Sequence, residues 1–302
     1  MTDERYDVVI LGSGPAGLQA AIHAGRRKAS VLVLGRLPRS SSYNAHIENF
    51  CCLHGDTGAE LLKQAHLKAE ESGAKFLEQD VTEITMDNGR FSLQVESGRH
   101  LDAAALIFAM GISRKKLGLK GEKNLLGRGI SYCVDCDAGF YKGEAVAMIG
   151  CESAALTGAL TLLLYAKEVH LICDKPDATD VLIEKIRESP IQLHESRKVA
   201  EILGDESVTG LELDDGARID VGGVFIELGA KGATMLAGAL GVALDKDTMK
   251  YIATNKKQET NVPGVYAAGD ICGPPWQVAK AIGEGCVAGL EAAAYAKKLR
   301  NA

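Results

Sequence analysis

Residues 131–137 contain the side chains best suited to chemistry, because Cys133 and Cys136 are separated by two residues and Asp137 follows directly. In such a pair one thiolate attacks a disulfide to form a mixed disulfide, which the second thiol resolves. Asp137 supplies a carboxylate able to carry protons during that exchange. A CxxC also occurs in zinc sites and in ordinary cores, so the spacing alone is only moderately specific.

The other cysteines help to decide between zinc and redox chemistry. Zinc normally takes four ligands, so a second CxxC or a Cys/His pair would be needed. None of the remaining cysteines has that spacing: Cys51, Cys52, Cys151, Cys173, Cys272 and Cys286. These six are expected to be ordinary semi-buried thiols. Redox chemistry is therefore favoured at the CxxC, and other segments must supply the electrons.

The composition is typical of a well-cored α/β protein, and the length of 302 residues favours two domains. Aromatic residues make up only 5% and the net charge is −6, which disfavours nucleic acid as a partner. The N-terminus lacks the layout of a signal peptide, and no apolar run reaches transmembrane length. We therefore expect a cytoplasmic protein with no membrane contact, where a CxxC is more often catalytic than structural.

A nucleotide-binding βαβ unit is predicted at the start of the chain. An apolar strand at residues 7–11 leads into GSGPAG at 12–17, a helix to about residue 25 and a second strand at 30–34. In this GxGxxG, Gly12 permits the tight turn, Gly14 lets the backbone approach a pyrophosphate, and Gly17 lets helix and strand pack closely. The acidic residue expected after the second strand is replaced by Gly35 and Arg36, so the ribose contact must differ from the usual carboxylate.

The next segments are read from their periodicity. Residues 56–73 predict a helix with Leu61, Leu62, Ala65 and Leu67 as core candidates, and residues 75–97 predict a β-meander around an Asp-Asn-Gly turn. A buried strand is expected at 103–108. The basic run at 113–128 is interpreted as a solvated crossover between domains, with a docking surface for an acidic electron-transfer protein as the alternative.

A second dinucleotide-type unit appears when the first is shifted by 138 positions. Gly12 then falls on Gly150 and Arg36 falls on Asp174. The second fingerprint reads GCESAA, with Glu152 where the close-approach glycine should be, and its charge would repel a pyrophosphate. Asp174 could hold the 2′-OH of NADH, but a nucleotide-binding fold kept as a scaffold is the favoured interpretation.

The remaining segments lead back to the first domain. A helix is expected at 181–188 and strands at 199–203, 208–213 and 224–229, the last as the return to the first domain. A strand ending in Gly269-Asp270 would place a carboxylate beside the ribityl or phosphate part of a cofactor. Trp276, the only tryptophan, lies shortly after it and before an alanine-rich helix that extends to about residue 299.

Three motifs together resemble the low-molecular-weight thioredoxin reductases: GSGPAG at 12–17, CVDCD at 133–137 and GVYAAGD at 264–270. The resemblance implies a homodimer of α/β chains with two Rossmann-like, three-layer ββα domains. Residues 1–114 and 226–302 would bind FAD, and residues 117–223 would form an inserted, degenerate NAD(P)-type domain that carries the CxxC. Cys136 would face the flavin as the charge-transfer thiolate, Cys133 would attack the disulfide of thioredoxin, and Asp137 would act as general acid/base.

The resemblance also assigns the FAD-contacting positions. They are Gly12, Ser13, Gly14, Pro15, Ala16, Gly17, Gly35, Arg36, Asn49, Val81, Ala109, Met110, Gly111, Gly269, Asp270, Trp276, Gln277 and Val278. No metal ligand is assigned.

The departures from the family pattern concern the electron donor. Typical members carry GGGxSA and HRRxxxR for NADPH, whereas this chain has GCESAA and HLICDK. This is similar to the branch independent of pyridine nucleotides, which includes ferredoxin-linked enzymes. We therefore expect FAD-dependent thioredoxin reduction with a donor other than NADPH, such as ferredoxin, and a rotation of the inserted domain about residues 113–128 and 221–230. The alternatives are an NADH- or NADPH-dependent reductase, a non-enzymatic flavin-bound redox sensor and a zinc-binding scaffold.

Overall fold

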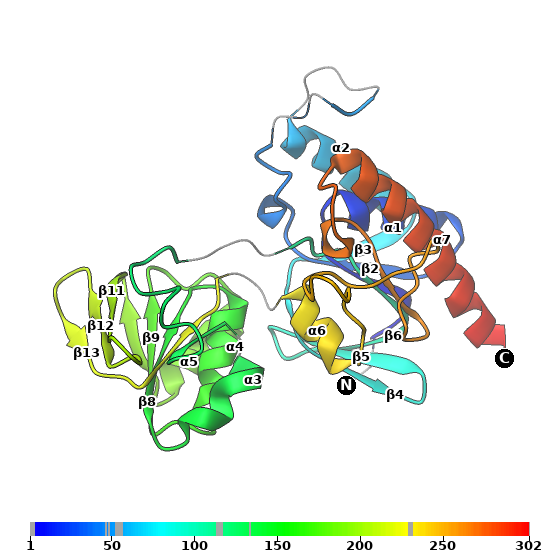
Figure 1. The fold of residues 1–302 in the computed structure, drawn as a ribbon. Helices are drawn as coiled ribbons and strands as arrows, with labels where there is room; N and C mark the ends of the chain where they lie inside the picture. Colours follow the sequence, from blue (N-terminus) through cyan, green and yellow to red (C-terminus); the bar gives the residue numbers. More distant parts are fainter. Residues whose placement is uncertain are drawn as a thin grey trace. The chain divides into compact units, whose positions relative to one another are not determined.

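The computed structural model describes residues 4–45, 47, 49–51, 57–112, 117–132, 134–228 and 232–301, apart from the side chains of Asp135 and Cys136. The chain divides into two compact units (Figure 1). The first comprises Met1–Ile112 and Gly232–Ala302, and the second comprises Ser113–Lys231. Both units contain a sheet with parallel strands covered by helices, which confirms the predicted α/β class with Rossmann-like folds.

The sheet of the first unit has the strand order β3-β2-β1-β6-β5-β4, with β15 also paired to β6. Its strands are β1 (Glu4–Leu11), β2 (Val31–Leu34), β3 (Ala74–Leu77), β4 (Val81–Asp87), β5 (Arg90–Val95), β6 (His100–Phe108) and β15 (Val265–Ala267). The start of β6 pairs antiparallel with β5, and its end pairs parallel with β15. The carboxyl ends of β1, β6 and β15 therefore lie at one edge, where α/β sheets place their ligands.

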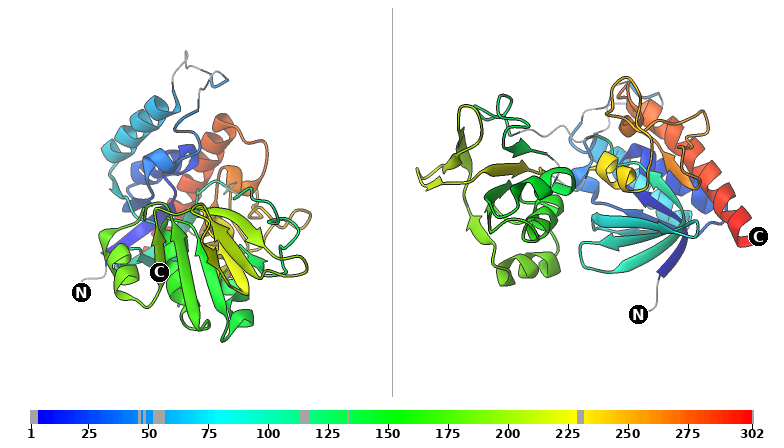
Figure 2. Two further views of the ribbon diagram at one scale, coloured as in Figure 1. Left: turned by 90° about the vertical axis from the view of Figure 1, so that its left-hand side faces the viewer. Right: turned by 60° about the horizontal axis from the view of Figure 1, so that its bottom comes forward.

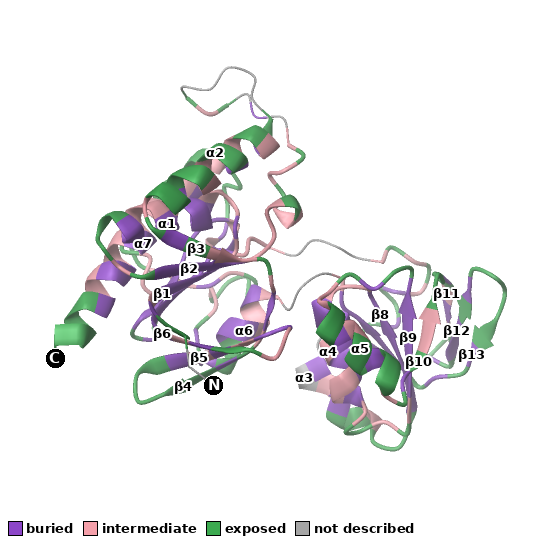
Figure 3. Ribbon diagram, turned by 180° about the vertical axis from the view of Figure 1, so that it is seen from behind, coloured by how far each residue is buried: buried purple, intermediate pink, exposed green. Residues whose placement is uncertain are grey.

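Helices cover one face of this sheet, and the β4–β5 hairpin and α6 cover the other (Figure 2). The helices are α1 (Pro15–Arg26), α2 (Gly58–Glu71), α6 (Ala233–Ala239) and α7 (Val278–Asn301), with short turns η1 (Leu37–Arg39) and η3 (Asp270–Cys272). Because side chains alternate along β1, Val8 and Ile10 join the core under α1 and α7, whereas Val9 and Leu11 join the core under α6. Figure 3 shows the buried residues concentrated on the strands.

The α1–α7 contact is unusually close because glycines on α7 face alanines on α1. A Cβ atom added at Gly285 would lie 2.2 Å from the carbonyl oxygen of Ala16, and one at Gly289 would lie 2.3 Å from that of Ala20. No other residue type fits at these two positions without movement of the helices. The contact holds the first turns of α7 against the beginning of α1.

The predicted helix at 56–73 is present as α2, although one core assignment was wrong. Thr57 and Glu60 form a capping box at its start, which fixes the first turn. Leu62 is fully buried, but Leu67 is 52% exposed. The buried positions Gly58, Leu62 and Ala69 are spaced four and seven residues apart, so they define a face of the helix that excludes Leu67.

The second unit combines a five-stranded parallel sheet, ordered β10-β9-β8-β14-β7, with a three-stranded antiparallel sheet, β11-β12-β13. Its elements are β7 (Ile130–Ser131), α3 (Val134–Asp137), η2 (Ala138–Tyr141), β8 (Ala145–Ile149), α4 (Ser153–Leu162), β9 (Glu168–Cys173), α5 (Asp180–Glu188), β10 (Gln192–Glu195), β11 (Val199–Leu203), β12 (Gly210–Leu213), β13 (Arg218–Ile219) and β14 (Gly223–Ile226). One core lies between the two sheets, and a second lies under α3, α4 and α5.

The internal repeat predicted at an offset of 138 is present in the structure. β1 ends at Leu11 and β8 at Ile149, and α1 begins at Pro15 and α4 at Ser153, so both differences equal 138. Gly12 and Gly150 both have positive φ, at 112° and 150°. A Cβ at either glycine would collide with a carbonyl oxygen at the end of a neighbouring parallel strand, that of Ala109 or Glu227.

The boundary of the second unit differs from the sequence prediction. β14 was expected to return the chain to the first domain, and that domain was expected to resume at residue 226. Instead β14 pairs with both β8 and β7, so it completes the sheet of the second unit, and the first unit resumes at Gly232. Residues 223–226 are therefore part of a folded sheet, while 229–231 and 113–116 lie outside the described residues.

The described part of the basic run is folded around its single acidic residue. Glu122 is buried and accepts hydrogen bonds from the main-chain N–H groups of residues 117–119 and from the hydroxyl of Tyr132. Burial tends to raise the pKa of Glu122, but these hydrogen bonds outweigh it and the pKa is lowered. Residues 117–128 therefore belong to the second unit, with Lys120, Lys123 and Arg128 exposed on its surface.

Candidate functional site

The turn after β1 has the geometry of a phosphate-binding loop. Gly14 precedes α1, Pro15 begins it, and the first turn of the helix contains no acidic residue. A Cβ at Gly17 would lie 1.9 Å from the oxygen of Gly12, so helix and turn pack too closely for a side chain there. A Cβ at Gly14 would lie 3.2 Å from the hydroxyl of Ser40, so a side chain there would need Ser40 to move, although no backbone atom is in the way. The N–H groups that begin α1 and a glycine without a side chain fit the pyrophosphate of a dinucleotide such as FAD.

Two further predicted segments converge on this turn. The Ala109–Gly111 segment follows β6, and a Cβ at Gly12 would lie 2.3 Å from the oxygen of Ala109. Gly269 follows β15, and a Cβ there would lie 3.0 Å from the Cβ of Ala16. Both contacts follow from the parallel pairing of β1, β6 and β15, which brings the carboxyl ends of these strands together.

Asn49 and Gln277 meet although they are 228 positions apart in the sequence. The amide nitrogen Nδ2 of Asn49 donates to Oε1 of Gln277 over 2.7 Å. Gln277 immediately precedes α7, whose first residue is Val278. Its neighbour Trp276 is 45% exposed and does not belong to a buried core. The structure therefore brings together two residues that the family resemblance assigns to the flavin.

Arg36 takes part in a partly buried network of charges behind the end of β2. Its Nη1 lies 3.0 Å from Oδ2 of Asp80 and 2.9 Å from Oε1 of Glu96, and Arg39 pairs with Asp80 at 2.7 Å. The side chain of Glu96 is completely buried, and it also accepts a hydrogen bond from the Asp80 N–H. The two guanidinium groups thus compensate the charges of two buried carboxylates. Val81, the residue after Asp80, is buried at the start of β4.

Lys280 and Glu284 hold the loop that contains Asp270. Nζ of Lys280 donates to the carbonyl oxygens of Gly269 and Gly273, at 2.8 and 2.7 Å. The carboxylate of Glu284 accepts from the Gly269 N–H at 2.8 Å and pairs with Lys280 at 3.0 Å. Sequence reasoning missed this clamp. Its only local signal is a Lys and a Glu four residues apart on a helix.

The CxxC segment is described in part. Cys133 lies outside the described residues, and Cys136 is placed on α3 by its backbone alone. Asp137 accepts a hydrogen bond from the Ser131 hydroxyl at 2.6 Å. At the other end of α3, the Val134 N–H points to Oε1 of Glu227 at 3.4 Å, and Glu227 is only 9% exposed. Two carboxylates therefore lie near the ends of this short helix, and sequence reasoning identified only Asp137.

The turn after β8 differs from its counterpart in the charged residues at equivalent positions. Under the 138-residue offset, Gly14, Arg36 and Arg39 correspond to Glu152, Asp174 and Asp177. A main-chain bridge joins Glu152 to Asp177, and the Asp177 N–H donates to the oxygen of Cys151 at 2.7 Å. The loop after β9, which contains Asp174 and Asp177, therefore lies beside the turn that contains Glu152. Two arginines and a glycine are replaced by three carboxylates at equivalent positions.

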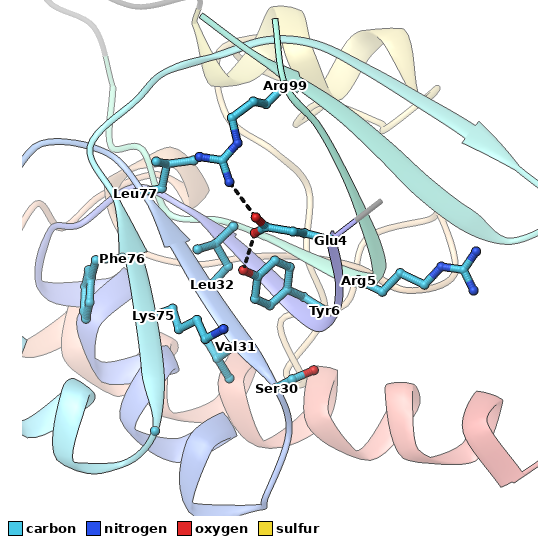
Figure 4. Close-up of a pocket in the computed structure, with 11 residues that line it drawn as sticks. Glu4, Arg5, Tyr6, Ser30, Val31, Leu32, Lys75, Phe76, Leu77 and Arg99 are labelled. Carbon is cyan, nitrogen blue, oxygen red and sulfur yellow. Dashed lines mark hydrogen bonds and ion pairs between the residues drawn. The ribbon is translucent and has the colours of Figure 1, made fainter. Parts of the chain in front are cut away.

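A pocket of about 400 Å³ lies at the opposite edge of the first sheet (Figure 4). It is formed where β1, β2 and β3 begin, away from the phosphate-binding turn. In it, Glu4 accepts hydrogen bonds from the Tyr6 hydroxyl at 2.9 Å and from Arg99 at 2.8 Å. Since these polar groups pair with one another and no glycine-rich turn lines the pocket, we assign it no part in nucleotide binding.

Two further searches cover only the described residues. No three His, Cys, Asp or Glu side chains there are grouped so that they could hold a metal ion. None of the helices in that part of the chain combines the length and the apolar character that a membrane span requires.

Residues 6–285 match the family described as pyridine nucleotide-disulphide oxidoreductase. Over 312 aligned residues the chain is 32% identical to thioredoxin reductase from Listeria innocua, covering 99% of this chain and 97% of that protein. An atypical thioredoxin reductase from Desulfovibrio vulgaris Hildenborough superposes with a TM-score of 0.83 and 32% identity, covering 98% and 99% of the two chains. A ferredoxin-flavin thioredoxin reductase from Clostridium acetobutylicum gives a TM-score of 0.69 and 34% identity, with 99% of each chain covered.

Proposed function

Because the chain belongs to the thioredoxin reductases of the pyridine nucleotide-disulphide oxidoreductase family and is an FAD-binding oxidoreductase, we propose that it reduces the disulfide of thioredoxin with electrons from a donor other than NADPH. The contrast between its two nucleotide-type turns carries this proposal. The turn of the first unit is glycine-rich and flanked by arginines, whereas the equivalent turn of the second unit is flanked by carboxylates.

In this proposal FAD is held by the first unit and supplies a group that takes up and passes on an electron pair. The N–H groups at the start of α1 bind its pyrophosphate, and the clamped loop at Gly269 positions Asp270 beside it. The hydrogen bond between Asn49 and Gln277 fixes the segment directly before α7, which would contact the flavin. All of these FAD-contacting candidates lie in the first unit, whereas the CxxC lies in the second.

The chemistry of the second unit is disulfide exchange. Cys136 is the thiol on the flavin side, and the Cys133 thiolate attacks a sulfur atom of the thioredoxin disulfide to form a mixed disulfide. Cys136 then attacks Cys133, which releases reduced thioredoxin and leaves the Cys133–Cys136 disulfide to be reduced again. Asp137, held by the Ser131 hydroxyl, takes up and returns the proton of the exchanging thiol.

The proposed donor is an electron-transfer protein such as ferredoxin. Two observations support it: the Clostridium acetobutylicum relative is a ferredoxin-flavin thioredoxin reductase, and the second turn of this chain is acidic. Two like charges about 4 Å apart repel by roughly 4 kcal/mol at an effective dielectric of about 20. Glu152 alone would therefore weaken pyrophosphate binding by close to three orders of magnitude, at about 1.4 kcal/mol per decade. A homodimer and a cytoplasmic location stay predictions.

Trapping the mixed disulfide tests the roles of the two cysteines. In a Cys136→Ser variant, Cys133 can attack a disulfide but no second thiol of the pair resolves the product. A thioredoxin that retains only its attacked cysteine, activated as the mixed disulfide with thionitrobenzoate, should therefore accumulate as a covalent complex while Cys133 displaces thionitrobenzoate. Mass spectrometry of the tryptic peptide 129–142 should place the linkage at Cys133. The matched Cys133→Ser variant should give little complex. Recovery of the complex only through a cysteine outside this peptide would overturn the proposal.

A further inference from the structure

Two cysteines outside the CxxC lie side by side at the carboxyl edge of the second sheet. Cys173 is the last residue of β9, and Cys151 lies in the turn after the neighbouring strand β8. β8 and β9 are parallel and in register up to Ile149 and Ile172, and the Gly150 N–H donates to the oxygen of Ile172 at 3.2 Å. The same register places Cys173 beside Gly150, the residue directly before Cys151. The fold thus brings the two thiols together from positions 22 residues apart.

The contacts of Cys151 distinguish it from an ordinary core thiol. Its sulfur is hydrogen-bonded to the thiol of Cys173 and also receives the main-chain N–H groups of Lys175 and Asp174. The hydrogen bond from Cys173, aided by the two N–H groups, lowers the pKa of Cys151 against the effects of burial and of the Asp174 charge. The pKa of Cys173 is raised, first by the same hydrogen bond and then by burial.

Burial separates the roles that the two thiols can take. Cys151 is half-buried, whereas Cys173 is 1% exposed, so Cys151 is the more accessible of the two residues. A thiolate is the reactive form of cysteine, and a second thiol in contact with it can capture its oxidised product. The pair therefore provides an accessible nucleophile and a shielded resolving group.

We propose that Cys151 and Cys173 are a second redox pair, which small hydroperoxides oxidise to a disulfide within the acidic turn of the second unit. The Cys151 thiolate attacks one oxygen of hydrogen peroxide, the O–O bond breaks, and Cys151 sulfenic acid and hydroxide form. The sulfur of Cys173 then attacks the sulfur of Cys151, its proton leaves with the departing oxygen, and water is released. Two thiols and one peroxide thus give one disulfide and two waters, and the two electrons pass to the peroxide. A dithiol returns the pair to its reduced form by exchange.

The pair lies at the turn that binds a pyrophosphate in nucleotide-binding βαβ units, so the thiol and a phosphate would compete for the same N–H groups. Cys151 occupies the second position of the degenerate fingerprint, directly after Gly150 and before Glu152. A turn that held a pyrophosphate would cover this thiol and would use the nearby N–H groups for the phosphate oxygens. In the acidic turn the N–H groups of Asp174 and Lys175 are directed to the sulfur of Cys151 instead. This inference stands on the geometry of the second unit and is independent of the substrate and donor proposed above.

Peptide mapping of the full-length, FAD-loaded protein tests the proposal directly. The protein is treated with a slight excess of hydrogen peroxide, its remaining thiols are alkylated, and it is digested with trypsin without reduction. Because Lys175 precedes a proline, Cys173 falls in peptide 168–185, Cys151 falls in peptide 143–167, and the CxxC stays within peptide 129–142. We expect a species in which peptides 143–167 and 168–185 are joined, and we expect dithiothreitol to separate it.

Variants distinguish the two thiols. Cys173→Ser should leave Cys151 as a sulfenic acid that dimedone labels, and Cys151→Ser should abolish both the linkage and the dimedone adduct. Cys286→Ser, a half-buried cysteine on α7, is the matched control and should leave the linkage unchanged. If peroxide leaves both peptides of the wild-type protein alkylated, carries Cys151 to sulfinic acid without a linkage, or joins Cys151 to a different peptide, the proposal is wrong. The wild-type map requires no variant to fold.

Discussion

Gly14 and Glu152 occupy equivalent positions in the two turns, and in our proposal this difference separates a turn that binds a nucleotide from one that does not. Gly14 adds no side chain to its turn, whereas Glu152 adds a carboxylate at the equivalent position. Arg36 and Arg39 correspond in the same way to Asp174 and Asp177. Three substitutions of opposite electrostatic effect thus separate the two halves of an internal repeat.

The first prediction transfers the acidic residue to the first turn. Gly14→Glu should weaken FAD binding by about three orders of magnitude, because a carboxylate near the pyrophosphate costs roughly 4 kcal/mol. Flavin retained after dialysis, measured by absorbance and protein content, gives the result. Gly14→Ala separates the steric effect from the charge and should lose less flavin than Gly14→Glu, since it adds only a methyl group, whose carbon would lie 3.2 Å from the Ser40 hydroxyl. Full flavin content in Gly14→Glu would show that the pyrophosphate lies elsewhere.

Several residues of the site could be predicted because their signal is local. Gly12, Gly14 and Gly17 lie within six residues between a strand and a helix, and the motif carries its own structural context. Asp80 and Glu96 carry no such signal, since their pairing with Arg36 depends on the fold that brings β4 and β5 beside the end of β2. Asn49 and Gln277 became candidates only through the resemblance to a family, because nothing in their neighbourhoods points to a contact across 228 positions.

At the scale of elements, the relation between α1 and α7 positions the site. The two helices meet through glycine and alanine, which lets the start of α7 approach the phosphate-binding turn. Periodicity predicted both helices and many of the strands, but it predicted neither β7 nor β10. It did not assign β14 to the second sheet. An apolar sequence predicts a buried strand in either unit, and only the pairing with β8 shows to which sheet β14 belongs.

Close packing of these helices leads to a second prediction. Gly285→Ala should lower stability by about 1–3 kcal/mol, since the added methyl would collide with the Ala16 carbonyl oxygen. Gly283→Ala on the same helix meets nothing within 4 Å and should be neutral or stabilising by up to about 1 kcal/mol. Thermal unfolding followed by circular dichroism compares the two variants. Equal midpoints would mean that the α1–α7 contact adjusts without cost.

The clamp at the start of α7 gives a third prediction. Lys280→Met should release the loop at Gly269 and Gly273, because two carbonyl oxygens lose their donor and Glu284 loses its ion pair. We expect FAD affinity to fall by about tenfold to a hundredfold, which corresponds to roughly 1.5–3 kcal/mol for hydrogen bonds to a charged group. Isothermal titration of the apoprotein with FAD measures the change. Lys297→Met, at an exposed position near the end of α7, should leave the affinity unchanged, and a similar loss there would indicate a general effect on the helix.

At the scale of the whole molecule, the two units keep the same βαβ framework and use it differently. In our proposal the first unit binds a dinucleotide at its glycine-rich turn, whereas the second contains the CxxC, whose Cys136 lies in α3, and an acidic turn after β8. A nucleotide-binding framework can persist without its nucleotide because the packing of β8, α4 and β9 does not depend on phosphate contacts. If the second unit binds no nucleotide, as we propose, electrons must reach the flavin from a donor other than NADPH.

An anaerobic titration of the FAD-loaded protein, followed by flavin absorbance, tests this route most directly. NADPH, NADH and chemically reduced ferredoxin are added separately to equal amounts of enzyme, and oxidised thioredoxin is added afterwards. We predict that reduced ferredoxin bleaches the flavin band and that thioredoxin restores it, while neither nucleotide changes the spectrum within the turnover time. Prompt, stoichiometric bleaching by NADPH or NADH would contradict the account, because it would show that the acidic second turn still accepts a pyridine nucleotide.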